Sequence, residues 1–152
     1  MNFKSVEERE ERIKLALRSI GDILVPKYDA DWMPSGYVRG EDGLLYPSEF
    51  LQLSVAEKDR ICNGVGGGEF AKYIPDTIWG LNVAKSADGH DFSYDKGGWE
   101  VEREIADKVF YFNLITQING SFALLRPVRK IRARTYYRIV RGVGYFFFNY
   151  KR

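Results

Sequence analysis

The chain has very little of the two residue types that most often carry chemistry at neutral pH. It contains one cysteine and one histidine among 152 residues. A single cysteine excludes an internal disulfide, so packing, with or without a metal, must hold the fold together. Hydrophobic residues make up 45% of the sequence. That share is enough to bury a core, and we expect one domain over residues 1–152.

Long apolar runs are also absent. No stretch approaches the roughly 20 apolar residues of a membrane-spanning helix. The charged N-terminal residues lack the apolar run and the small-residue cleavage site of a secretory signal. We therefore expect a cytoplasmic protein without a transmembrane helix.

Acidic residues are missing from the C-terminal part of the chain. No aspartate or glutamate follows Asp107, whereas nine of the 23 lysine and arginine residues lie beyond residue 125. The rest of the chain is net acidic. A basic end on an acidic body predicts an anionic partner, either a phospholipid membrane surface or a nucleic acid.

Hydrophobic periodicity predicts a mainly α fold. Residues 5–20 carry apolar side chains at helical spacing behind a capping serine. They belong to an N-terminal segment, residues 1–24, that suits docking or a contact between copies in a homo-oligomer. Glu41-Asp42-Gly43 predicts the turn of a small β-hairpin. We expect residues 69–81 to form an irregular loop in which Trp79 packs inward.

Two further helices are predicted on either side of a glycine turn. The first covers about residues 83–94, and the second runs from residue 99 or 100 to 118. Lys96-Gly97-Gly98 separates them, and a link this short makes the two helices antiparallel neighbours. His90 and Asp107 lie at similar distances from the turn, so we expect their side chains to face each other.

This pair predicts a hydrolytic site. An imidazole is a natural general base near neutral pH when an acceptor fixes one nitrogen and the other activates water. Asp107 is placed to be that acceptor for His90. Asp91 points about 100° away around the helix, where it can hold a cation together with carbonyls of the glycine-rich segment 62–68. Taken singly, these features also suit a structural histidine, solvated acids and a flexible turn.

The C-terminal residues 126–152 combine bases with aromatic side chains. A helix is predicted from about Val128 to Val140, followed by the aromatic run 145–150. Four arginines of this region suit a lipid interface or a nucleic acid: Arg132, Arg134, Arg138 and Arg141. In the alternative interpretation the aromatic side chains pack on the core and the arginines stay solvated.

Three motifs occur in an order that resembles the phospholipase A2 superfamily. They are Asn63-Gly64-Val65-Gly66-Gly67, His90-Asp91-x-x-Tyr94 and Ala106-Asp107-x-x-Phe110. The likeness covers roughly residues 60–118, which would form the catalytic-type core. It is greater to the disulfide-free viral and bacterial or prophage branch than to the secreted animal enzymes.

The resemblance implies a role for each motif residue. His90 would activate water, Asp107 would hold His90, and Tyr94 would bond to Asp107. The N–H of Gly64 would face the oxyanion. Asp91 would bind calcium together with three backbone carbonyls, those of Cys62, Gly64 and Gly66. The implied activity is calcium-dependent hydrolysis of the sn-2 ester of glycerophospholipids at a membrane surface.

Two other functions stay open. The same frame could serve as a catalytically inactive structural or binding module in a phage or prophage context. The basic region 126–152 could instead bind nucleic acid or another anionic surface, and its affinity would then fall steeply with salt.

Overall fold

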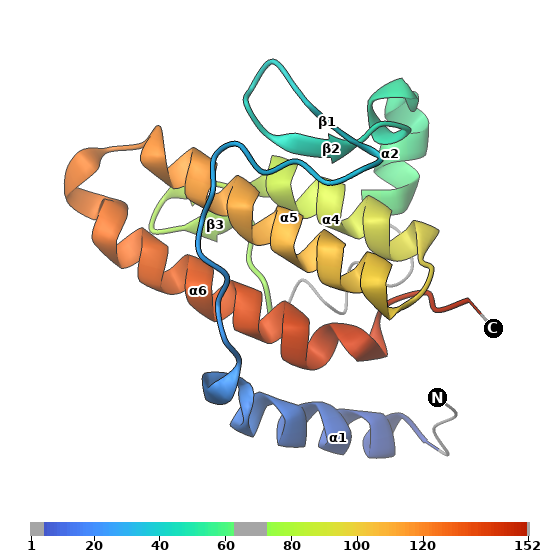
Figure 1. Ribbon diagram of the computed structural model, residues 1–152. Coiled ribbons are helices and arrows are strands. Elements are labelled where there is room, and N and C mark those ends of the chain that lie inside the picture. The colour runs from blue at the N-terminus through green and yellow to red at the C-terminus, as the bar shows by residue number, and fades with distance from the viewer. Residues whose placement is uncertain (1–4, 63–72, 152) are drawn as a thin grey trace.

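The computed structural model of the chain is mainly helical, as the periodicity predicts (Figure 1). It describes residues 5–62 and 73–151. Gly64 and Gly66, the expected metal and oxyanion residues, lie outside the described residues. The described part contains five α-helices: α1 (Val6–Arg18), α2 (Val55–Cys62), α4 (Ala84–Lys96), α5 (Glu100–Asn119) and α6 (Arg126–Val143).

Short elements connect these helices. One antiparallel hairpin pairs β1 (Tyr37–Arg39) with β2 (Leu45–Pro47), and another pairs β3 (Thr77–Ile78) with β4 (Leu81–Asn82). Within the described ranges, single 3₁₀ turns occur at four places: η1 (Ile20–Asp22), η2 (Phe50–Gln52), η3 (Ala123–Leu125) and η4 (Gly144–Phe146).

Helices α4 and α5 form the central antiparallel pair (Figure 1). The Asn82 side chain accepts the N–H of Ala84 at 2.9 Å, at the start of α4. Gly97 ends this helix with a φ of +69°, a conformation that suits glycine. The Glu102 carboxylate accepts the N–H of Trp99 at 2.8 Å and so caps α5. Local turn chemistry therefore explains both ends of the link.

The C-terminal residues pack against the turn between α4 and α5. The Gly98 N–H donates to the Asn149 carbonyl at 3.1 Å, and the Lys151 N–H donates to the Gly98 carbonyl at 2.8 Å. A Cβ added at Gly97 would lie 1.8 Å from the Asn149 carbonyl oxygen. Only glycine fits there, because the far end of the chain occupies the space of a side chain.

The core lies where α5 passes between its neighbours. Leu114 and Ile118 of α5 are buried together with Val140 of α6. The extended segment that follows η1 crosses α5 (Figure 1), where Tyr28 and Trp32 pack edge-on against Phe112. Since α5 is covered on several sides, any polar side chain along its centre needs a partner inside the protein.

The predicted hairpin at Glu41-Asp42-Gly43 is present as β1 and β2. Its second strand is fastened to α5 by one side chain. The Asn113 amide accepts the N–H of Leu45 and donates to the carbonyl of Leu45, both at 2.8 Å. These two bonds satisfy a buried amide and fix the hairpin against the helix pair.

The expectation that Trp79 packs inward is wrong, because its side chain is 56% exposed. Trp79 and Gly80 form the turn between β3 and β4, with φ of +47° and +77°. The inward position of this hairpin is filled by the buried Ile78. The buried Arg129 of α6 fixes this turn, since its Nη2 donates to the Trp79 carbonyl at 2.7 Å.

The N-terminal helix follows its predicted cap. The Ser5 Oγ accepts the N–H of Glu8 at 3.1 Å, and α1 lies along α6 (Figure 1). Its inward face carries the buried Ile13, whereas Leu15 is exposed. Among the helices of the described residues, none is both long and apolar enough to cross a membrane.

Gly97→Ala is expected to destabilise the protein more than Gly36→Ala. Both glycines have a positive φ, +69° and +84°, so both variants carry backbone strain. Gly97 also has a ψ of −156°, a combination that essentially only glycine adopts. Only at Gly97 does the new methyl group meet a backbone oxygen. We expect about 2 kcal/mol of additional loss, or roughly 4–8 °C in Tm. Equal Tm shifts for the two variants in thermal unfolding would contradict this account of the turn.

Candidate functional site

The structure brings His90 of α4 and Asp107 of α5 together. The His90 Nε2 lies 2.8 Å from the Asp107 Oδ1. His90 is 5% exposed and Asp107 is not exposed at all. The contact forms because the short glycine turn aligns the two helices antiparallel, which sets these two positions opposite each other. In a site this dry, a hydrogen bond to a carboxylate orients an imidazole strongly.

Tyr94 joins the same carboxylate oxygen. Its hydroxyl donates to the Asp107 Oδ1 at 2.6 Å. Tyr94 follows His90 by one helical turn, and the two rings lie 4.1 Å apart between centroids. Phe110 lies on the His90 ring as well, at 4.8 Å. Burial and then the Asp107 charge raise the pKa of Tyr94 well above its ordinary value, so Tyr94 stays a hydrogen-bond donor.

Two arginines reach the other oxygen of Asp107, and the sequence did not predict either contact. The Arg141 Nη1 donates to Oδ2 at 2.7 Å, and the Arg103 Nη1 lies 3.6 Å from the same atom. Arg103 precedes Asp107 by four residues on α5, a spacing that could have indicated an ion pair. No local pattern indicates the contact with Arg141, because it depends on how α6 crosses α5.

Glu100 connects the two arginines at the start of α5. Its carboxylate accepts from the Arg103 Nη2 at 2.8 Å, the Arg141 Nη2 at 3.0 Å and the Tyr150 hydroxyl at 2.5 Å. Burial opposes ionisation of Glu100, but the bonds from Arg103 and Tyr150 outweigh it and lower its pKa to about 2. Two carboxylates and two guanidinium groups therefore form one connected network beside His90.

Asp91 lies beside His90 but on another face of α4. Within the described part of the chain, no hydrogen bond or ion pair reaches its half-buried carboxylate. Burial raises the pKa of Asp91 to about 7; His90 opposes the shift, and Asp88 and Asp76 add to it. A half-buried carboxylate without a counter-charge among the described residues is a candidate position for a bound cation.

Cys62 is the other expected calcium ligand that lies within the described residues. Cys62 ends α2 close to α4, where its thiol donates to the Asp88 carbonyl at 3.8 Å. Burial and then the Asp88 and Asp91 charges raise the pKa of this thiol to about 12 in the metal-free protein. The expected calcium site would use the backbone carbonyl of Cys62, because calcium prefers oxygen ligands. The described residues contain no group of three or more His, Cys, Asp or Glu side chains placed to hold a metal.

The four arginines that the sequence suggested for an anionic surface have different surroundings. Arg132 and Arg134 are exposed on α6. The Arg138 Nε donates to the Ile23 carbonyl at 3.0 Å, and Arg141 belongs to the Asp107 network. The aromatic residues between them behave as the alternative interpretation expects, since Tyr136 and Tyr137 are buried.

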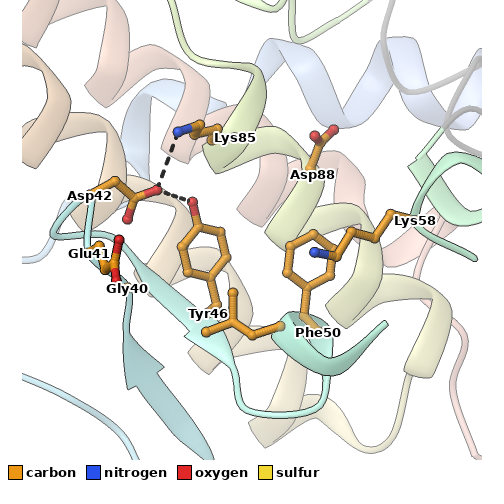
Figure 2. Close-up of a pocket in the computed structure, with 9 residues that line it drawn as sticks. Gly40, Glu41, Asp42, Tyr46, Phe50, Lys58, Lys85 and Asp88 are labelled. Carbon is orange, nitrogen blue, oxygen red and sulfur yellow. Dashed lines mark hydrogen bonds and ion pairs between the residues drawn. The ribbon is translucent and has the colours of Figure 1, made fainter. Parts of the chain in front are cut away.

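A separate hollow lies on the far side of α4 (Figure 2). It has a volume of about 710 Å³ and is lined by charged and aromatic side chains, among them Asp42, Tyr46, Phe50, Lys58, Lys85 and Asp88. The Tyr46 hydroxyl donates to Asp42 at 2.6 Å, and the Lys85 ammonium lies 3.7 Å from the same carboxylate. Lys85 and Asp88 project from the face of α4 that is turned away from His90.

Comparison of the chain with protein family models, with characterised proteins and with solved structures found no match. The case for a function therefore depends on the geometry around His90, Asp91 and Asp107.

Asp91→Asn is expected to stabilise the metal-free protein at pH 8. The folded protein holds the Asp91 carboxyl at a pKa of about 7, whereas an unfolded chain has roughly 3.9. Between these values the folded state binds more protons, so its stability falls as the pH rises. Asparagine cannot ionise, so the gain should reach about 4 kcal/mol at pH 8 and fall to a few tenths of a kcal/mol at pH 4.

Urea unfolding of both proteins at the two pH values measures this effect. Asp95→Asn is a matched control, because Asp95 is exposed on the same helix. The same gain at pH 4 and pH 8 would contradict the assignment of a strained carboxylate to Asp91.

Proposed function

We propose that this chain is a phospholipase A2-like hydrolase that cleaves the sn-2 ester of glycerophospholipids with the help of calcium. The observation that carries the proposal is the buried hydrogen bond of 2.8 Å between His90 and Asp107, with the Tyr94 hydroxyl on the same carboxylate oxygen. The Asp91 carboxylate, next to His90 in the sequence and without a counter-ion in the described residues, supports a cation site close by.

His90 would act as the general base. Its Nε2 faces the Asp107 carboxylate, so the neutral ring carries its proton there and Nδ1 is the basic nitrogen. Nδ1 would take a proton from water as the water oxygen attacks the ester carbonyl carbon. The imidazolium would then return the proton to the departing glycerol oxygen, releasing a fatty acid and a lysophospholipid. Asp107 and Tyr94 would hold the ring in the productive orientation.

Asp91 would hold the calcium ion, with the backbone carbonyls of Cys62, Gly64 and Gly66 as further ligands. A carboxylate with backbone carbonyls is a donor set that calcium favours over softer metals. The bound ion would stabilise negative charge on the ester oxygen during attack. The N–H of Gly64 would face the same oxygen.

An anionic phospholipid surface is the partner that the exposed residues favour. Arg132 and Arg134 are exposed in the first half of α6, and the turn before this helix exposes Phe122 and Leu124. Ile131 is exposed between the two arginines and the turn. Bases next to exposed apolar side chains suit the boundary between lipid headgroups and acyl chains.

A structural or binding module without catalysis is the second candidate. The observation that favours it is the pair of arginines on Asp107, because a buried ion network can hold helices in register without any reaction. A folded protein that binds calcium but does not hydrolyse lipid would support this second candidate over the first.

Calcium titration tests the cation site directly. We expect saturable binding by calorimetry in the parent protein and at least about tenfold weaker binding in Asp91→Asn, because the variant loses the only charged ligand proposed. Asp95→Asn should bind as the parent does. No binding by the folded parent would overturn the calcium part of the proposal.

Hydrolysis tests the role of His90. The substrate is a vesicle of mixed phosphatidylcholine and phosphatidylglycerol with a labelled sn-2 chain, and the released fatty acid is measured. His90→Gln should lower the rate by about 10³-fold or more, because it removes the general base. Tyr94→Phe should have a smaller effect, since His90 keeps its acceptor. A His90→Gln protein with full activity would refute the mechanism.

A further inference from the structure

The two oxygens of the Asp107 carboxylate have separate sets of partners. Oδ1 receives His90 and Tyr94, at 2.8 and 2.6 Å. Oδ2 receives the Arg141 Nη1 at 2.7 Å. A carboxylate held at both oxygens cannot rotate about its Cβ–Cγ bond without breaking one set of bonds. The orientation of Oδ1 toward His90 therefore depends on what holds Oδ2.

Arg141 holds Oδ2 with a geometry that a lysine cannot reproduce. Its Nη1 donates to Asp107, while its Nη2 donates to the Glu100 Oε1 at 3.0 Å. The planar guanidinium bridges the two carboxylates with two donors in a fixed relation. The side chain is 17% exposed, so water competes weakly for these bonds.

Arg103 cannot take over this task, although it lies nearby. Its Nη1 is 3.6 Å from the Asp107 Oδ2, which is ion-pair distance but too long for a hydrogen bond. That same Nη1 donates to the carbonyls of Val140 and Arg141, both at 3.2 Å, and the other guanidinium nitrogens donate to Glu100. Arg103 therefore contributes positive charge near Asp107, whereas the hydrogen bond from Arg141 fixes the orientation of the Asp107 carboxylate.

We propose that Arg141 is a positioning residue for His90, which acts by fixing the rotation of the Asp107 carboxylate. Only the catalytic consequence rests on the proposed function. The positional relation concerns the folded protein alone. Helix α6 lies outside residues 60–118, so the site would need a part of the chain beyond the phospholipase-like core.

The single histidine makes the test direct. In ¹⁵N NMR of protein labelled only at histidine, the two imidazole nitrogens of His90 give the only ring signals. At pH 8 we expect the parent to show one dominant neutral tautomer with the proton on Nε2. Arg141→Gln and Arg141→Lys should both lose this dominance, through mixed tautomers or faster exchange of the Nε2 proton.

Matched variants interpret the spectra. Asp107→Asn is the positive control for loss of the acceptor. Arg18→Gln is the negative control, because Arg18 is exposed at the end of α1. Glu100→Gln removes the charge of the second partner of Arg141 at a half-exposed position and so weakens that bond. It should give an intermediate change even where a variant of Arg141 fails to fold. Parent-like signals in every folded variant of Arg141 and Glu100, with a change in Asp107→Asn, would overturn the proposal.

The hydrolysis assay separates this proposal from the proposed function. If the parent is active, Arg141→Lys should lower kcat by about 10–100-fold with little change in KM, and Arg18→Gln should change neither. Altered imidazole signals without lipid hydrolysis by the parent would sustain the positioning role and reject the phospholipase function. If the parent hydrolyses lipid and the imidazole signals are unchanged in the Arg141 and Glu100 variants, the phospholipase function is supported and the positioning role of Arg141 is rejected.

Discussion

Asp107 places a carboxylate at the centre of the helical core, where side chains of the protein must replace water as its partners. A charge removed from water costs several kcal/mol unless the protein replaces the lost hydrogen bonds. Here the replacements come from three helices: His90 and Tyr94 on α4, Arg103 on α5 itself and Arg141 on α6. Each helix must keep its place to satisfy this one group, so Asp107 links the packing of the core to the orientation of the imidazole.

The end of the chain supports the same arrangement from outside the helix pair. Asn149 and Lys151 bond to the glycine turn between α4 and α5, and Tyr150 bonds to Glu100. Gly144 lies so close to Tyr94 that a Cβ there would meet the tyrosine hydroxyl at 2.1 Å. Part of the basic aromatic C-terminal region therefore packs inside the fold against the helix pair. Fewer of its arginines are exposed than its composition suggests.

The two carboxylates near His90, those of Asp107 and Asp91, have different surroundings. Asp107 is satisfied by four neighbouring groups, whereas Asp91 has no partner in the described residues and a pKa of about 7. The protein stabilises the Asp107 carboxylate with several partners. Asp91 has a raised pKa and therefore adds nothing to the stability of the folded protein. A carboxylate with a raised pKa beside an imidazole is consistent with the calcium site proposed above.

Several elements of the fold follow from local rules that can be applied to the sequence. Helical periodicity indicated α1, α4, α5 and α6, and turn chemistry indicated the β1–β2 hairpin and the glycine link. From that link alone His90 and Asp107 could be set opposite each other, because a short turn leaves two helices one arrangement. The contact of Tyr94 with Asp107 was implied only by the resemblance to the phospholipase A2 superfamily.

Which arginine reaches Asp107 depends on how α6 crosses α5. Packing between residues far apart in the chain sets that crossing, so no local pattern could indicate the contact. For the same reason the C-terminal residues at Gly97 could not be foreseen. Trp79 points outward because a two-residue turn with positive φ at both positions turns its side chain away from the core, and a Trp-Gly pair gives no sign of such a turn. Local sequence specifies elements and their links, whereas the partners of a buried charge depend on the whole fold.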